Sequence, residues 1–288
     1  MQIPVLVLGG TGTLGVPVVK SLVEGGHHVR VFTRSAQRAK DLFGPEVEAF
    51  EGEPTNRRHL EQALRGCQAV HVSLPTESEL VAVEHIATLA DTRAAGDLRR
   101  VSYISGTSVC EENRWFQVID VKMKAEERLR KTGIPCTVFC PTWVMEVLPS
   151  FVRPDRAVVI EGKNPPGFHF FAAADFGRMV AASYQDDRAL GKRLFILGPQ
   201  SLTLREAIQR FHEARLPQVM LRRLRPWQAR LLARLARNPS LGGVARLIAY
   251  FDSTEEHGDP SEANNLPGRP ETTLDQWIQS RTLDGPGD

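Results

Sequence analysis

Three glycines, Gly9, Gly12 and Gly15, carry the clearest chemical signal in the sequence, at a spacing that differs from the G-x-G-x-x-G fingerprint. They follow an apolar run at residues 3–8 that predicts a strand buried on both faces and precede an apolar-periodic helix. Gly9 permits a sharp turn, Gly12 lets the backbone approach a pyrophosphate, and Gly15 lets the helix pack tightly. The order of strand, turn and helix predicts a dinucleotide site; a purely structural turn is the alternative.

The end of the second predicted strand, residues 29–33, indicates which dinucleotide binds. NAD enzymes usually place an Asp or Glu there for the adenosine ribose. This chain has Arg34 instead, followed by Ser35 and Arg38. A guanidinium suits a ribose 2′-phosphate, so the pattern favours NADP(H) over NAD(H). The alternative is an arginine on a surface loop.

Other candidate residues are less specific. Ser105 ends a predicted strand, where an open sheet places its ligands. His169 lies in an aromatic stretch and either contacts a planar substrate or is a partly buried structural histidine, whereas His71, inside a strand, is expected to be structural. No cluster of histidine, cysteine or carboxylate side chains has metal-ligand spacing, so no metal is expected.

The elements that position these residues alternate in a regular way. Strands alternate with helices five times by residue 105, which predicts an α/β protein with a doubly wound parallel sheet. From residue 141 the rhythm loosens and prolines become frequent, as expected of a substrate-binding excursion. We expect a dinucleotide-binding domain at 1–145 and a smaller, interleaved substrate region at 146–288, with a strand at about 193–197 that returns to the sheet.

Composition and charge narrow the class of protein. The 288 residues are 42% hydrophobic and 24% charged, which is ordinary for a globular protein, and no apolar run is long enough for a membrane span. The four cysteines form no C-x-x-C pair, and the N-terminus shows no signal peptide, so we expect a cytoplasmic chain. No nucleic-acid partner is expected.

Charge is unevenly distributed near the C-terminus. Residues 193–250 carry 11 basic and 2 acidic side chains, and residues 251–288 carry 2 basic and 9 acidic ones. Within the arginine-rich segment 222–237, a predicted helix has one stripe of apolar side chains and a second of arginines. These are Trp227, Leu231 and Leu235, and Arg230, Arg234 and Arg237. The pattern suits docking on a membrane or partner; a domain helix with a solvated face is the alternative.

The glycine turn resembles that of the atypical short-chain dehydrogenases/reductases, and specifically their NmrA-like branch. Further stretches similar to that branch extend over nearly the whole chain. They are Leu60-x-x-Ala63-Leu64-x-Gly66, Lys122-x-x-x-Glu126, Gly133-Ile134-Pro135-Cys136-Thr137, Pro141-Thr142-Trp143, Ala174-Asp175-Phe176-Gly177 and Arg269-Pro270-Glu271-Thr272-Thr273-Leu274. The resemblance implies a Rossmann-type NAD(P)-binding domain with a small C-terminal substrate region.

The resemblance also implies roles for particular residues. The pyrophosphate is expected at Gly9, Thr11, Gly12, Thr13, Leu14 and Gly15, and the adenosine phosphate at Arg34, Ser35 and Arg38. The ribose is expected at Ser73, Leu74 and Pro75, and the nicotinamide at Ser105, Lys122, Pro141, Thr142 and Trp143.

One departure from the family pattern bears on catalysis. Most short-chain reductases have a tyrosine four residues before the lysine, and this chain has Val118 there. Lys122 is then the candidate catalytic residue, as the lysine is in isoflavone-reductase-like relatives; a surface ion pair with Glu126 is the structural alternative.

Three functions remain open on these grounds. The first is an NADPH-dependent reductase of a quinone or another small conjugated carbonyl. The second is a non-catalytic NADP(H)-binding redox sensor with a regulatory protein partner. The third resembles an accessory subunit of respiratory complex I that docks through residues 222–237.

Overall fold

The computed structural model describes residues 2–163, 165–237 and 239–282. The chain divides into two compact units that interleave along the sequence. The first unit contains residues 1–141, 173–196 and 258–270, and the second contains residues 142–172, 197–257 and 271–288. Each unit has its own core of buried hydrophobic side chains.

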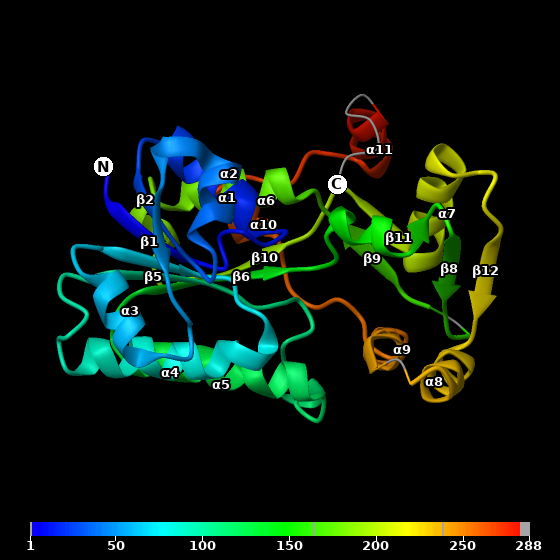
Figure 1. The fold of residues 1–288 in the computed structure, drawn as a ribbon, viewed down its shortest axis with the longest axis horizontal. Coiled ribbons are helices and arrows are strands. Elements are labelled where there is room, and N and C mark those ends of the chain that lie inside the picture. The colour runs from blue at the N-terminus through cyan, green and yellow to red at the C-terminus, as the bar shows by residue number, and fades with distance from the viewer. Residues whose placement is uncertain (1, 164, 238, 283–288) are drawn as a thin grey trace. The chain divides into compact units, whose positions relative to one another are not determined.

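The first unit is built on a parallel sheet (Figure 1). Within the described residues it has seven strands, in the order β10 (Arg193–Ile196), β6 (Cys136–Pro141), β5 (Arg100–Ile104), β4 (Ala69–Val72), β1 (Pro4–Leu8), β2 (His28–Thr33) and β3 (Glu48–Glu51). Every neighbouring pair is parallel. The prediction of a doubly wound parallel α/β sheet is confirmed. From β1 the chain winds outward to β2 and β3, and it then returns to β4 and winds the other way. The switch point, where such sheets bind ligands, therefore lies between β1 and β4.

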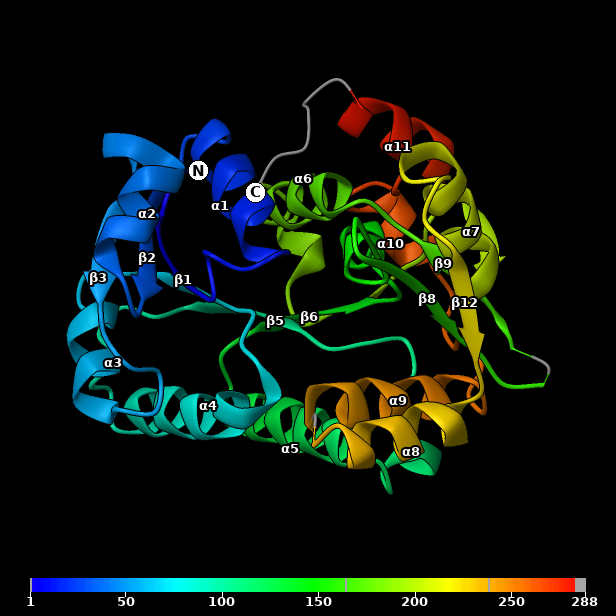
Figure 2. The same ribbon diagram turned by 45° about the vertical axis from the view of Figure 1, so that its right-hand side comes forward.

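Helices cover both faces of this sheet (Figure 2). The first unit contains α1 (Gly15–Glu24), α2 (Ala36–Phe43), α3 (Arg57–Leu64), α4 (Thr76–Asp91), α5 (Gln117–Lys131), α6 (Ala173–Ser183) and α10 (Ser261–Asn265), with the short 3-10 helices η1 (Gly44–Glu46), η2 (Glu111–Asn113) and η4 (Asp187–Ala189). Helices α1 and α6 pack together on one face, and α3, α4 and α5 form a row on the other. β1 and β4 are almost wholly buried between these layers, which explains the apolar sequence of β1 and, apart from His71, of β4.

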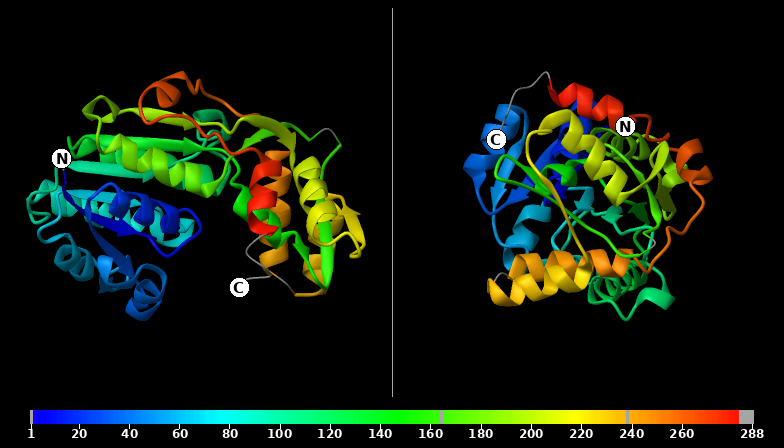
Figure 3. Two further views of the ribbon diagram at one scale, coloured as in Figure 1. Left: turned by 90° about the horizontal axis from the view of Figure 1, so that it is seen from above. Right: turned by 90° about the vertical axis from the view of Figure 1, so that its right-hand side faces the viewer.

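The second unit has a separate arrangement of short strands and helices. Strands β7 (Val152–Arg153), β8 (Arg156–Ile160) and β12 (Leu221–Leu224) form one sheet, and β9 (Gly167–Phe170) pairs antiparallel with β11 (Gln200–Thr203). The helices are the 3-10 helix η3 (Met145–Ser150), α7 (Leu204–Arg215), α8 (Pro226–Leu235), α9 (Pro239–Phe251) and α11 (Leu274–Thr282). Helices α8 and α9 lie side by side (Figures 2 and 3). Among the described residues, no helix combines the length and apolarity needed to cross a bilayer.

His71 is fully buried in the sheet of the first unit, as expected of a structural histidine. One of its ring nitrogens, Nδ1, lies 2.8 Å from Ser102 Oγ, which lies 2.8 Å from the Tyr184 hydroxyl. Burial lowers the pKa of His71 to about 3, so the ring is neutral in the folded protein at neutral pH. The unfolded chain takes up this proton at an ordinary histidine pKa, near 6.5.

Stability is therefore expected to fall as the pH drops from about 6.5 towards 3, because only the unfolded state binds the proton. This one group lowers the free energy of unfolding by up to about 1.4 kcal/mol per pH unit in that window. Urea denaturation at several pH values measures the slope. The variant His71→Leu should have a shallower slope by this amount, and parallel curves for both proteins would contradict the assignment.

Candidate functional site

The glycine turn closes against the end of a neighbouring strand. Gly9 has φ +79°, and a Cβ on it would lie 1.9 Å from the Ser73 carbonyl oxygen, so only glycine fits. A Cβ on Gly15 would lie 2.0 Å from the Gly9 carbonyl oxygen. Only glycine therefore lets the first residue of the helix lie this close to the backbone of the turn. Residues 10–14 are turn rather than helix, and α1 begins at Gly15 instead of near the predicted Gly12.

The start of α1 is available to an anion. No side chain caps its N-terminus, where Leu14 is the N-cap residue. The positive end of the helix dipole lies here, although the Val16 N–H already donates to the Gly12 carbonyl oxygen at 3.0 Å and Pro17 has no N–H. Gly12 lies at this place, and a Cβ on it would meet only the Gly9 carbonyl oxygen, at 3.2 Å. The turn can therefore hold a phosphate, as its sequence predicts.

Alanine at Gly12 and Gly15 is expected to separate binding from folding. Gly15→Ala collides with the turn, so it should lower both the stability and the dinucleotide affinity. Gly12→Ala should leave the melting temperature nearly unchanged, because a small shift of the Gly9 carbonyl oxygen makes room for the Cβ. It should still weaken binding by about tenfold, since the Cβ would take up space predicted for the phosphate. Thermal melting and calorimetric titration measure the two effects. Equal affinities for Gly12→Ala and the wild type would contradict this role for the turn.

A cleft of about 870 Å³ lies at the carboxyl edge of β1, β2, β3 and β4. Eleven of the predicted site residues line it, namely Gly9, Thr11, Gly12, Thr13, Leu14, Arg34, Ser35, Arg38, Ser73, Leu74 and Pro75. The structure thus brings together the residues predicted for the pyrophosphate, the adenosine phosphate and the ribose, except Gly15, which does not line the cleft. Their contacts with a cofactor stay a prediction.

Two arginines give this cleft a positive end. Arg34 follows β2 directly, and Ser35 caps α2 by accepting a hydrogen bond from the Arg38 backbone N–H at 3.3 Å. Both arginine side chains are exposed, and within the described residues no hydrogen bond or ion pair engages either guanidinium. Two unengaged guanidinium groups, one just before α2 and one in its first turn, can bind a dianionic phosphate.

Sequence reasoning missed part of this cleft. Its lining also includes Phe32, Thr33, Gly52, Glu53, Pro54, Thr55, Glu77 and Ser78. Residues 52–55 follow β3, which pairs in parallel with β2, so the loops after these two strands reach the same edge. A prediction that placed the third strand beside the second would have found this loop, because neighbouring parallel strands end at the same edge of a sheet.

Lys122 lies elsewhere in the first unit and is held by a buried carboxylate. Its ammonium donates to Glu79 Oε1 and to the Ile104 carbonyl oxygen, each at 2.9 Å. The Glu79 side chain is only 1% exposed and that of Lys122 is 17% exposed. Glu79 Oε1 also accepts from the Tyr103 hydroxyl at 2.8 Å, and burial and the Glu79 charge raise the pKa of Tyr103 well above its ordinary value. Tyr103 is therefore a fixed neutral donor and does not replace the tyrosine missing at Val118.

Ser105 and Glu126 form a second polar group beside the first. The Ser105 hydroxyl donates to Glu126, whose other oxygen lies 3.4 Å from Arg193 Nε. Arg193 also donates to the Val109 carbonyl oxygen at 2.6 Å. The alternative of a Lys122–Glu126 surface pair is therefore wrong, because the two side chains have different partners.

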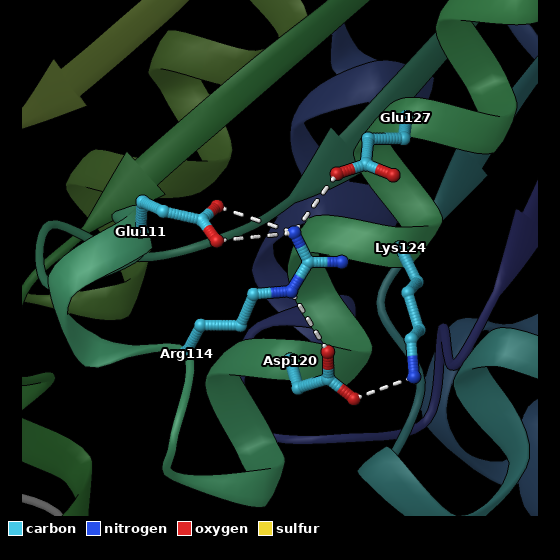
Figure 4. Close-up of polar contacts among 5 residues, drawn as sticks. All are labelled: Glu111, Arg114, Asp120, Lys124 and Glu127. Carbon is cyan, nitrogen blue, oxygen red and sulfur yellow. Dashed lines mark hydrogen bonds and ion pairs between the residues drawn. The ribbon is translucent and has the colours of Figure 1, made fainter.

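An ionic cluster holds the loop after β5 onto α5 (Figure 4). Arg114 lies between Glu111, Asp120 and Glu127, with its Nε 3.0 Å from Asp120. Lys124 pairs with Asp120 at 2.7 Å, and these two cations lower the pKa of Asp120. The cluster fixes the loop on the helix that carries Lys122.

The remaining predicted residues fall at or after the end of β6. Pro141 is the last residue of β6, and its carbonyl oxygen accepts from the Thr107 N–H at 3.1 Å. Thr142 and Trp143 belong to the second unit. Trp143 is buried in that unit's aromatic core, with its ring 4.9 Å from that of Phe251.

His169 has a specific partner in the second unit. Its Nδ1 lies 2.6 Å from Glu256, which also accepts from the His169 backbone N–H and the Thr142 hydroxyl. Glu256 therefore fixes the imidazole on β9. Among the described residues, no group of three or more metal-ligating side chains comes together.

The parallel sheet, its crossover helices and the glycine turn at the switch point define a Rossmann-type α/β protein. The chain belongs to the NmrA-like family, whose model matches residues 1–223. The recognition made from the sequence motifs is confirmed.

The known proteins that are similar to this chain include two reductases and a quinone oxidoreductase. Phenylcoumaran benzylic ether reductase TP7 of Nicotiana tabacum is 24% identical over 215 residues, which cover 68% of this chain and 69% of that protein. The solved structure of Citrobacter sp. triphenylmethane reductase complexed with NADP(H) has a TM-score of 0.77 at 17% identity and covers 96% of this chain and 99% of its own. An NADPH-dependent quinone oxidoreductase of Escherichia coli, complexed with NADPH, has a TM-score of 0.76 at 20% identity, with coverage of 96% and 99%. At these identities the two structures show the shared fold.

Proposed function

We propose that the chain is an NADP(H)-dependent reductase that acts on a quinone or another small conjugated carbonyl. The observation that carries the proposal is the pair of unengaged arginines, Arg34 and Arg38, in the same cleft as the glycine turn. Together these features suit a dinucleotide with a 2′-phosphate. The similar proteins support the proposal, since a benzylic ether reductase, a triphenylmethane reductase and a quinone oxidoreductase are among them.

In this proposal the chain binds and orients the cofactor and the substrate, and the cofactor supplies a hydride when it is bound. The start of α1 holds the pyrophosphate, Arg34 and Arg38 hold the 2′-phosphate, and residues 73–75 line the ribose. Ser105 and residues 141–143 stay our prediction for the nicotinamide end.

Lys122 is the proposed proton donor at the substrate carbonyl. An ammonium has three N–H donors, and two are engaged by Glu79 and Ile104. Among the described residues no further acceptor engages the ammonium, which leaves the third N–H for a ligand. The pairing with Glu79 keeps the ammonium oriented, and a donor fixed in this way needs no tyrosine at position 118.

Turnover is the direct test of this function. NADPH oxidation is followed in the presence of a panel of quinones and α,β-unsaturated carbonyl compounds. The proposal expects catalytic consumption of NADPH with at least one member, and more slowly with NADH. A broad panel that gives no turnover, despite tight NADPH binding, would contradict it.

The absent tyrosine favours a second candidate, a non-catalytic NADP(H)-binding regulator. Val118 stands where the acid of most short-chain reductases lies, and the buried Tyr103 is committed to Glu79. A redox sensor should bind NADPH and NADP⁺ with clearly different affinities, or bind a partner protein in only one of the two states. Equal affinities for NADPH and NADP⁺ together with turnover would exclude the regulator and leave the reductase.

A further inference from the structure

Helix α8 in the second unit packs on its neighbour by a very narrow face. Among its described residues only Ala229 and Ala233 are buried, one helical turn apart. Gly242 of α9 lies close to Ala233, since a Cβ on Gly242 would be 3.6 Å from the Ala233 Cβ. Small side chains on both helices allow this close approach. No other described side chain of α8 is buried, and only Pro226 and Gln228 are partly buried.

The opposite face of α8 is apolar and exposed. Trp227, Leu231 and Leu235 follow one another at a spacing of four residues, with side chains 59%, 49% and 74% exposed, and Leu232 beside them is 44% exposed. At about 100° per residue these four side chains span about 140° of the helix. The centre of this arc is about 150° from the centre of the Ala229–Ala233 face. The helix thus presents its most hydrophobic surface to solvent, where each such side chain costs free energy.

The surroundings of this face are strongly cationic. Residues 214–251 contain eight arginines and no Asp, Glu or Lys. Seven of them are exposed, namely Arg222, Arg223, Arg225, Arg230, Arg234, Arg237 and Arg246. Arg225 donates to the Gly162 carbonyl oxygen. No ion pair to a carboxylate forms at any of these arginines within the part of the chain that the structure describes. On the helix, Arg230 and Arg234 lie on one flank of the apolar face.

We propose that α8 docks the protein on an anionic lipid bilayer, with Trp227, Leu231 and Leu235 in the interfacial region and the arginines on lipid phosphates. An amphipathic helix with Trp and Leu on one face and arginines on its flank has the composition that binds in the plane of such a surface. The proposal rests on α8 alone and is independent of the proposed reductase function.

The charge pattern favours lipid over two other occupants. A second copy of the same face would bring exposed arginines against arginines, which repel. A nucleic acid would engage the arginines but gain little from three exposed leucines. A bilayer with anionic headgroups uses both the apolar side chains and the arginines.

Co-sedimentation with lipid vesicles tests the proposal. The full chain is mixed with phosphatidylcholine vesicles that contain phosphatidylglycerol, and with vesicles of phosphatidylcholine alone. We expect binding to the anionic vesicles at low salt, at least about tenfold weaker binding to the neutral ones, and release by added salt. In addition, Trp227 emission should shift to the blue on binding, and the variant Trp227→Phe should lose that shift.

Two paired variants and matched controls separate α8 from the rest of the surface. Leu231→Ser with Leu235→Ser, and Arg230→Ser with Arg234→Ser, should each weaken partitioning by about tenfold or more. The exposed pair Arg57→Ser with Arg58→Ser on α3, and the exposed Val81→Ser on α4, should bind as the wild type does.

Two results would overturn the proposal. One is a wild type that stays in the supernatant with anionic vesicles at low salt. The other is a dimer in sedimentation velocity that the paired leucine variant dissociates, because the face is then an interface between two copies. All of the changed side chains are exposed, and thermal melting checks that each variant is folded.

Discussion

Replacing Lys122 with alanine is expected to lower both stability and turnover, for separate reasons. The change leaves the Glu79 carboxylate buried, and among the described residues only the Tyr103 hydroxyl still donates to it. Removal of one partner from a buried ion pair costs about 3 kcal/mol of the free energy of unfolding. Turnover is expected to fall by about 100-fold or more, since the proposed proton donor is lost. Urea denaturation and steady-state kinetics measure the two losses.

A second substitution distinguishes the structural role of Lys122 from the catalytic one. Adding Glu79→Gln to Lys122→Ala removes the uncompensated charge and still leaves an acceptor for Tyr103. Most of the lost stability should return, whereas turnover should not. A matched control is Lys124→Ala on the same helix, because Lys124 pairs with Asp120 at the surface (Figure 4) and its loss should cost less than about 1 kcal/mol.

Either of two outcomes contradicts this assignment. Wild-type stability in Lys122→Ala would show that the pair with Glu79 contributes nothing. Full turnover in the double variant would show that Lys122 takes no part in the chemistry, and a water molecule would then be the proton donor.

Replacing Arg34 with alanine is expected to remove the preference for NADPH over NADH. A hydrogen-bonded contact from a guanidinium to a phosphate contributes about 1.5–3 kcal/mol. NADPH affinity should therefore fall by about 10- to 100-fold, and further with Arg38→Ala added. NADH lacks the 2′-phosphate, so its affinity should not change. Fluorescence titration of the reduced nicotinamide measures both.

Arg57→Ala is the control that shows whether the loss of any exposed positive charge weakens dinucleotide binding. It is exposed on α3 and is not among the residues that line the cleft. Arg57→Ala should keep both affinities. If Arg34→Ala weakens NADPH and NADH equally, the arginine acts on a part common to both, and the 2′-phosphate assignment is wrong.

Much of the fold follows from the sequence because its local signals agree with each other. The apolar runs of β1 and β4, the glycine turn and the cap at Ser35 all indicate the parallel sheet and its crossovers. The sequence also predicts that a strand at about 193–197 returns to the sheet, but not every part of the interleaving. Residues 258–270 join the first unit through contacts of α10 with β10, and no local pattern predicts contacts so distant along the chain.

Site residues that directly follow a strand could be predicted from the sequence. Side-chain partners that come from distant parts of the chain could not. The cleft brings Arg34 and Ser73 together because both directly follow strands that flank β1. The partner of Lys122 was missed, since Glu79 is 43 residues away and enters from α4. A carboxylate in the first turn of a helix suggests a capping role on the surface, and only packing shows that Glu79 is buried.

Calorimetric titration of NADPH and of NADH into the wild-type protein is the decisive experiment. We expect a one-to-one complex with NADPH and at least about tenfold weaker binding of NADH. Binding of neither dinucleotide would mean that the glycine turn is only structural here. Equal affinities would mean that Arg34 and Arg38 do not recognise a 2′-phosphate.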